Sequence, residues 1–107
     1  MKRPSDEELH KFKVKHNLPN KFVLFLGKLE PRKNIAGLIR AFNVVKNKGN
    51  FPDLKLVIIG SKGWLYDDIF KEIQHSNYRD HILLKSFIPD QERKFYYGLA
   101  EVFVYPS

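Results

Sequence analysis

Three cations occupy the segment GKLEPRKN, which directly follows the apolar run FVLFL. Lys28 comes after Gly27, and Arg32 and Lys33 come just before Asn34. Cationic side chains at the end of a strand and the start of a helix attract phosphate, because the free backbone N–H groups of the helix point to the same place. Alternatively, these residues are solvated loop cations. The spacing alone leaves both interpretations open.

The other polar residues form no recognised catalytic or metal-binding pattern. The segment GSKGW, which starts at Gly60, matches neither of the glycine-rich phosphate-binding signatures. The four histidines occur at no metal-ligand spacing, and the absence of cysteine removes thiolate sites and disulfides. We therefore predict no metal site and no bound cofactor, and we find no catalytic residue among these groups.

The apolar pattern predicts the elements that position these cations. Four short apolar runs predict strands near 22–27, 54–59, 82–84 and 102–105. Amphipathic stripes predict helices between them, the first beginning after an Asn34 cap, and another including Ile69, Phe70 and Ile73. Ser5 and Glu8 predict a capping box for an N-terminal helix.

Strands alternating with helices are typical of an α/β fold. The sequence predicts a Rossmann-like three-layer sandwich in which a four-stranded parallel sheet of order 3-2-1-4 has helices on both faces. Ligands of such sheets bind beyond the carboxyl ends of the strands, where the strand order reverses. That point lies between the first and fourth strands, so GKLEPRKN and the final YPS should be neighbours. A strand at the very end of the chain suggests a truncated piece of a longer protein.

Composition and charge limit the functions that need to be considered. The 107 residues carry a formal net charge of +7, which favours an anionic partner such as a phosphorylated small molecule, nucleic acid or acidic lipid. The longest apolar runs are much shorter than the roughly 20 residues of a membrane helix, so we expect a cytoplasmic location. Location at the inner face of the membrane stays open.

From Lys21 to the last residue, the sequence resembles the C-terminal, donor-binding domain of GT-B-fold glycosyltransferases of the retaining group 1 family. The resemblance is carried by four blocks in the same order: FVLFLGKLEPRKNIAGLIRAF, LKLVIIGSKGWLYDDIF, ILLKSFIPD and YYGLAEVFVYPS. It implies a domain 21–107 that is part of a nucleotide-sugar-binding fold, and a segment 1–20 that forms an N-terminal helix and an interdomain connector. The family's acceptor-binding N-terminal domain is missing from this sequence.

The resemblance also implies roles for individual residues. Gly27, Lys28 and Lys33 match the positions that hold the diphosphate of the donor, although the family usually has Arg where Lys28 stands. Lysine keeps the charge but lacks the planar fork of arginine. The loop that matches Phe87, Ile88 and Pro89 lies against the nucleobase, with Ile88 as a backbone contact. In addition, Ser107 matches the serine that opens the loop toward the family's next motif.

The function implied is transfer of a hexose, with mannose as the first choice, from a nucleotide diphosphate sugar to an acceptor hydroxyl. GDP-mannose or a UDP-hexose would be the donor, and the chain alone would be inactive. The alternative is a non-catalytic basic α/β module that binds nucleic acid or an acidic membrane surface, although we expect no nucleic acid partner. Peripheral membrane association of the whole enzyme and self-association through an uncovered sheet stay open.

Overall fold

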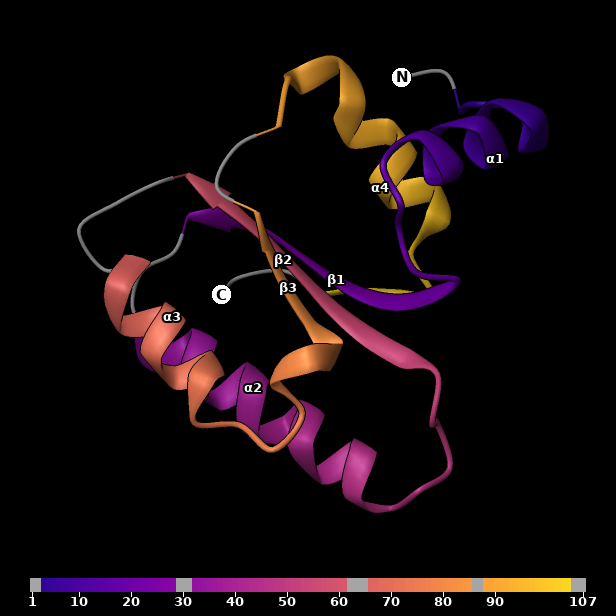
Figure 1. Ribbon diagram of the computed structural model, residues 1–107. Helices are drawn as coiled ribbons and strands as arrows, with labels where there is room; N and C mark the ends of the chain where they lie inside the picture. The colour runs from indigo at the N-terminus through magenta and orange to yellow at the C-terminus, as the bar shows by residue number, and fades with distance from the viewer. Residues whose placement is uncertain (1–2, 29–31, 62–65, 86–87, 105–107) are drawn as a thin grey trace.

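The computed structural model describes residues 3–28, 32–61, 66–85 and 88–104. It is a three-layer α/β arrangement with a parallel sheet in the middle. Helices α1 and α4 lie together on one face of the sheet, and α2 and α3 lie on the other (Figure 1). The α/β class and the parallel sheet are as predicted from the sequence.

The four strands are parallel and arranged in the order β3-β2-β1-β4, which is the order expected from the alternating pattern. They are β1 (Lys21–Lys28), β2 (Leu54–Ser61), β3 (Ile82–Lys85) and β4 (Val102–Val104). The β1–β2 ladder runs from Lys21 opposite Leu54 to Lys28 opposite Ser61. All four carboxyl ends therefore point toward one edge of the sheet.

The helices connect these strands in the predicted alternation. They are α1 (Asp6–Lys15), α2 (Arg32–Asn47), α3 (Tyr66–Gln74) and α4 (Arg93–Leu99), with short 3₁₀ turns η1 (Arg79–His81) and η2 (Asp90–Glu92). Helix α2 ends before Gly49, whose φ of +75° suits the left-handed termination of a helix. No helix within the described part of the chain is long and apolar enough to cross a membrane.

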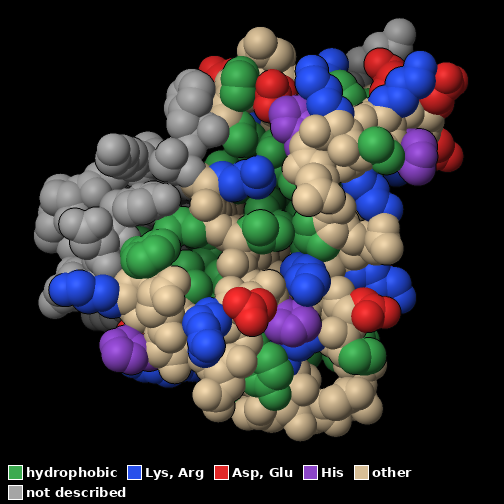
Figure 2. Space-filling model, in the orientation of Figure 1, with side chains coloured by type: hydrophobic (Ala, Val, Ile, Leu, Met, Phe, Trp, Pro, Cys, Tyr) green, Lys and Arg blue, Asp and Glu red, His purple; other side chains and the backbone are tan. Residues whose placement is uncertain are grey.

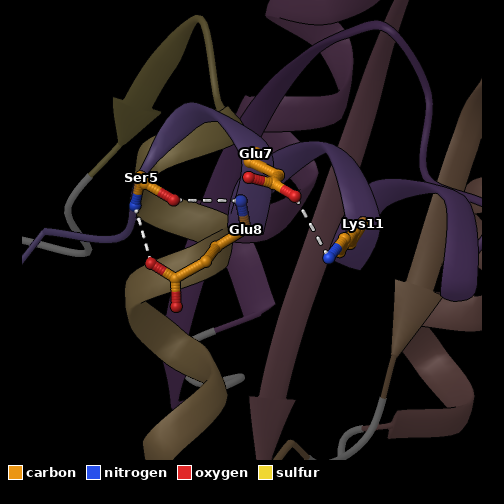
Figure 3. A network of polar contacts seen from close by, with 4 residues as sticks. All are labelled: Ser5, Glu7, Glu8 and Lys11. Carbon is orange, nitrogen blue, oxygen red and sulfur yellow. Dashed lines mark hydrogen bonds and ion pairs between the residues drawn. The ribbon is translucent and has the colours of Figure 1, made fainter.

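The start of α1 confirms the capping box (Figure 3). The backbone N–H of Glu8 donates to the Ser5 hydroxyl at 3.2 Å, and the Glu8 carboxylate accepts from the Ser5 N–H at 3.0 Å. One turn later, Lys11 pairs with Glu7 at 3.2 Å, but both side chains are exposed, so the ion pair adds little stability. The cap is therefore the main local determinant of where α1 begins.

Two apolar clusters fill the spaces on either side of the sheet. Alternate residues of each central strand face opposite clusters, so the strands are buried on both faces, as their continuous apolar runs predict. The α2–α3 cluster contains Phe25, Ile39, Phe42, Leu56, Ile58, Ile69, Ile73 and Ile82. The α1–α4 cluster contains Phe12, Leu18, Phe22, Leu24, Leu26, Val57, Ile59, Ile88 and Tyr96.

Aromatic rings attach α1 to α4 within the second cluster. The Phe12 ring stacks on Phe95 with centroids 4.5 Å apart and meets Tyr96 edge-on at 5.3 Å. At Gly98 the helices approach so closely that a Cβ atom would lie 2.9 Å from Cδ2 of Leu9. Helix α1 is therefore packed onto the sheet as part of the same core.

Three local expectations were wrong. The strand β1 does not end at Gly27, since Gly27 and Lys28 continue the ladder opposite Gly60 and Ser61. Helix α2 begins at Arg32 rather than after an Asn34 cap, because Arg and Lys are good helix formers and extend its first turn. Phe70 is exposed, since Ile69 and Ile73 are the side chains of α3 that face the sheet among those that the structure describes.

Candidate functional site

The carboxyl ends of the two central strands lie side by side. Gly27 of β1 is opposite Gly60 of β2, and Lys28 is opposite Ser61. Two glycines facing each other leave this level of the ladder without side chains, so a ligand can approach the backbone closely. The apolar run at 54–59 does not predict this glycine pair, because the pairing depends on the register between strands.

The first turn of α2 carries Arg32 and Lys33 and no acidic residue. The contrast with α1 is informative, because the first turn of α1 is acidic throughout, with Asp6, Glu7 and Glu8. A cation at a helix N-terminus opposes the helix dipole and costs about 0.3–1 kcal/mol at an exposed position. A bound anion would reverse this penalty, so the charge arrangement of α2 suits an anionic ligand.

The structure describes the predicted cationic residues only in part. The backbone of Lys28 ends β1, and the backbone of Lys33 is the second position of α2, while both side chains lie outside the described part. Phe87 and Ser107 also lie outside the described residues. Convergence of the two ammonium groups, and contacts made by Phe87 and Ser107, therefore stay predictions.

The fourth strand runs to the same edge as the first. Val104 of β4 is paired with Phe25, which is two residues before Gly27. Because the pairing is parallel, the chain leaves β4 in the direction in which β1 approaches the glycine pair. The sequence predicts that the ends of the first and fourth strands lie close together, and this proximity requires such a register.

The segment at Ile88 and Pro89 is held to the core by the Ile88 side chain. The Ile88 side chain is buried in the α1–α4 cluster, with 7% of its surface exposed. Pro89 is half-buried, and its carbonyl accepts a hydrogen bond from the N–H of Glu92 at 2.9 Å, which starts η2. The Ile88 side chain therefore belongs to the core, and the backbone contact with a nucleobase stays a prediction.

A buried lysine, Lys46, lies near the amino ends of the strands, at the opposite end of the sheet from the candidate site. Its role was not predicted from the sequence. The Lys46 ammonium donates to the carbonyl oxygens of Phe51, Pro52 and Leu54 at 3.0, 2.8 and 3.1 Å. Burial lowers the pKa of Lys46, and the positive charge of Lys55 lowers it further. All three N–H donors are used internally, so Lys46 holds the loop before β2 and is not available to a substrate.

The position of Lys46 in the helix was the one feature of the sequence that could have indicated this internal role. It lies four residues after Phe42 and seven after Ile39, both of which are buried on the sheet-facing side of α2. A lysine in line with a buried stripe should have suggested that its ammonium finds internal acceptors. Its partners follow from the path of the loop, which the helix pattern does not define.

The charged residues on the face seen in Figure 2 are mixed in sign. Lys and Arg side chains alternate there with Asp and Glu rather than forming one basic stripe. Among the described residues, no group of three or more His, Asp or Glu is placed to hold a metal ion. The visible face therefore gives no support to a continuous polyanion-binding surface.

The comparisons with known proteins concern almost the entire chain. A family model described as "Glycosyl transferases group 1" matches residues 6–107. The chain is 31% identical over 88 residues to O-antigen chain mannosyltransferase B of Escherichia coli, covering 80% of this chain and 22% of that protein. It is 38% identical over 90 residues to a Campylobacter jejuni enzyme, N-acetylgalactosamine-N,N'-diacetylbacillosaminyl-diphospho-undecaprenol 4-alpha-N-acetylgalactosaminyltransferase, covering 84% of this chain and 22% of that protein.

A third relative is the serotype-specific mannosyltransferase WbdA of Escherichia coli, which is 29% identical over 105 residues. That match covers 96% of this chain and 13% of the relative. The chain thus spans less than a quarter of the length of these three relatives. The family match extends from the first helix through all four strands, so it includes both the fold and the candidate site. The chain therefore belongs to the glycosyl transferases group 1 family.

Proposed function

We propose that this chain supplies part of the donor site of a retaining hexosyltransferase. The whole enzyme would transfer a hexose from a nucleotide diphosphate sugar to an acceptor hydroxyl, with the acceptor held by the rest of the protein. Two of the relatives are named mannosyltransferases, which favours GDP-mannose. The third is named an N-acetylgalactosaminyltransferase, which keeps a UDP-sugar as the alternative donor.

The observation that carries this proposal is the cationic first turn of α2 beside the end of β1. Arg32 and Lys33 occupy that turn without an acidic neighbour in it, and the paired glycines Gly27 and Gly60 are at the adjacent strand ends. A diphosphate fits such a place, because it is compact, doubly charged or more, and can accept backbone N–H donors.

In this mechanism, Lys28 and Lys33 act electrostatically. The bond between the anomeric carbon and the diphosphate oxygen breaks, and its electron pair goes to the diphosphate. The acceptor oxygen forms the new bond to the same carbon and gives its proton to the departing diphosphate. Ammonium groups beside the departing diphosphate stabilise its growing negative charge without forming a covalent intermediate.

The nucleobase would lie against the segment 87–89. Burial of the Ile88 side chain holds the backbone at Ile88 and Pro89, so that its peptide groups can serve as hydrogen-bonding partners for a base. We propose base contacts for Phe87, Ile88 and Pro89, and a donor contact for Ser107, which follows β4 in the sequence. These assignments rest on the match to the family and on the common direction of the parallel strands.

The proposed location is the cytoplasm, with the whole enzyme at the inner face of the membrane. The name of the Campylobacter relative includes a diphospho-undecaprenol acceptor, which is a lipid-linked substrate. Neither the family match nor the visible surface charge favours the alternative of a nucleic-acid-binding module. We therefore propose no second function.

The test is nucleotide binding by the chain itself, measured by titration calorimetry with GDP, UDP and inorganic pyrophosphate. Replacing Lys33 removes one charge-assisted contact, for which about 1.5–3 kcal/mol is typical, so Lys33→Ala should weaken binding roughly 10- to 100-fold. Lys48→Ala is the matched control, because Lys48 is exposed just beyond the other end of α2. Equal affinities for the two variants would remove Lys33 from the site.

A further inference from the structure

The amino ends of β2 and β3 are joined by a contact between two basic side chains. The ammonium nitrogen of Lys55, in β2, lies 3.2 Å from Nδ1 of His81, the last residue of η1. Both side chains are half-buried, and the two residues are 26 positions apart in the sequence. This place is at the opposite edge of the sheet from the candidate donor site, and the proposed function does not use it.

The geometry defines the protonation state of the imidazole. An ammonium group has only donors, so Nδ1 of His81 must accept, and the ring must be neutral with its proton on Nε2. Protonation of Nδ1 would place an N–H group against the Lys55 ammonium. The hydrogen bond would then be replaced by repulsion between two positive charges 3.2 Å apart.

Charged and aromatic groups from every neighbouring element act on this ring. Lys55 faces it from β2, Lys46 from α2 and Asp80 from η1. The Tyr78 ring meets it edge-on with centroids 6.1 Å apart, and Asn47 accepts a hydrogen bond from the Tyr78 hydroxyl at 2.6 Å. Burial lowers the pKa of His81, and Lys46 and Lys55 lower it further, while Asp80 opposes them.

We propose that the Lys55–His81 contact is an acid-sensitive link that holds the start of β3 to β2 and opens when His81 is protonated. The strand β3 is at the edge of the described sheet and pairs only with β2 there. Loss of the link would therefore loosen the edge strand that leads to Ile88, rather than the centre of the sheet.

The pH range follows from the direction of the shift. Because the neutral ring is favoured in the folded chain, the folded pKa is below the unfolded value of about 6.5. The stabilisation is complete above that unfolded value and is lost as the pH falls below it toward the folded pKa. The interval from pH 7.5 to pH 5.5 crosses the unfolded value, so the stabilisation should fall within it.

The direct test follows the Cε1–H signal of His81 by NMR during a pH titration of the chain. The wild-type midpoint should be below that of the urea-unfolded chain. Lys55→Met removes the donor and its charge and keeps an apolar stem, so it should raise the proton affinity of His81 by about three- to tenfold. A wild-type midpoint at or above the unfolded value, or an unchanged midpoint in the variant, would overturn the proposal.

The second test measures how much thermal stability is lost when the pH is lowered. In His81→Gln, the side-chain oxygen can still accept from Lys55 but has no proton equilibrium in this range. The variant should lose less thermal stability than the wild type between pH 7.5 and pH 5.5, whereas His75→Gln, at an exposed position, should behave like the wild type. Equal losses in wild type and His81→Gln would contradict the link. The NMR arm remains decisive if His81→Gln does not fold.

Discussion

The buried ammonium of Lys46 gives the sharpest prediction about stability. Lys46→Met keeps the length of the aliphatic stem but removes three charge-assisted hydrogen bonds of 2.8–3.1 Å. Bonds to a charged group contribute about 1.5–3 kcal/mol each, so the three together set an upper bound of about 4.5–9 kcal/mol.

Two effects make the expected loss of stability smaller than this upper bound. Phe51 and Pro52 are exposed, so their carbonyl oxygens can bind water once the ammonium is gone. The burial that lowers the pKa of Lys46 also means that the charge is costly to bury, and methionine removes that cost. We therefore expect a net loss of about 2–4 kcal/mol in the free energy of unfolding, mainly from the half-buried carbonyl of Leu54 and from loosening of the loop before β2.

Urea denaturation followed by circular dichroism measures this difference, with Lys48→Met as the control. Lys48 is exposed two residues further along, so its replacement should change the free energy of unfolding by less than about 0.5 kcal/mol. In thermal melts, Lys46→Met should lower the midpoint by at least about 8 °C, since about 4–8 °C corresponds to 1 kcal/mol in a domain of this size. Agreement between the two variants within 0.5 kcal/mol would refute the role of Lys46 in holding the loop.

Two further predictions concern helix α1. Gly98→Ala should destabilise the fold by a net amount of about 1 kcal/mol or less, because its Cβ would lie 2.9 Å from a terminal methyl carbon of Leu9, which can shift, and alanine has the higher helix propensity. In a Leu9→Ala background the same change should be neutral or stabilising, and a double-mutant cycle with no coupling would contradict the close approach. Ser5→Ala should cost about 1 kcal/mol by removing the N-cap acceptor, whereas Ser5→Asp should retain most of the stability in urea denaturation. Equal losses in the two Ser5 variants would exclude the cap as the cause.

Much of the fold could be predicted because its signals are local. The runs at 22–27 and 54–59 are apolar at nearly every position, and the structure buries alternate residues on opposite faces. The capping box needs only Ser5 and Glu8 at the correct spacing. Boundaries were harder to predict, since β1 continues through Gly27 only because β2 supplies a partner as far as Ser61.

The sequence predicts where in the sheet the candidate site lies, but it does not predict which side chains make contact there. Carboxyl ends of parallel strands must share an edge, so the sequence was sufficient to place the backbone of Lys28 at the end of β1 there, while the convergence of the cationic side chains stays a prediction. The internal roles of Lys46 and His81 could not be predicted in the same way, because their partners come from a loop path and from a residue 26 positions away. Neither the path of a loop nor a long-range polar pair has a periodic signature in the sequence.

The separation of these two regions has a consequence for engineering the protein. The polar contacts of Lys46 and of the Lys55–His81 pair brace the amino ends of the strands, whereas the cations proposed to meet the donor are at the carboxyl ends. A library that randomises the carboxyl-end loops would leave those braces untouched. Donor preference could then be altered without a matching decline in expression or solubility, and compensating substitutions would best be sought at the far end of the sheet.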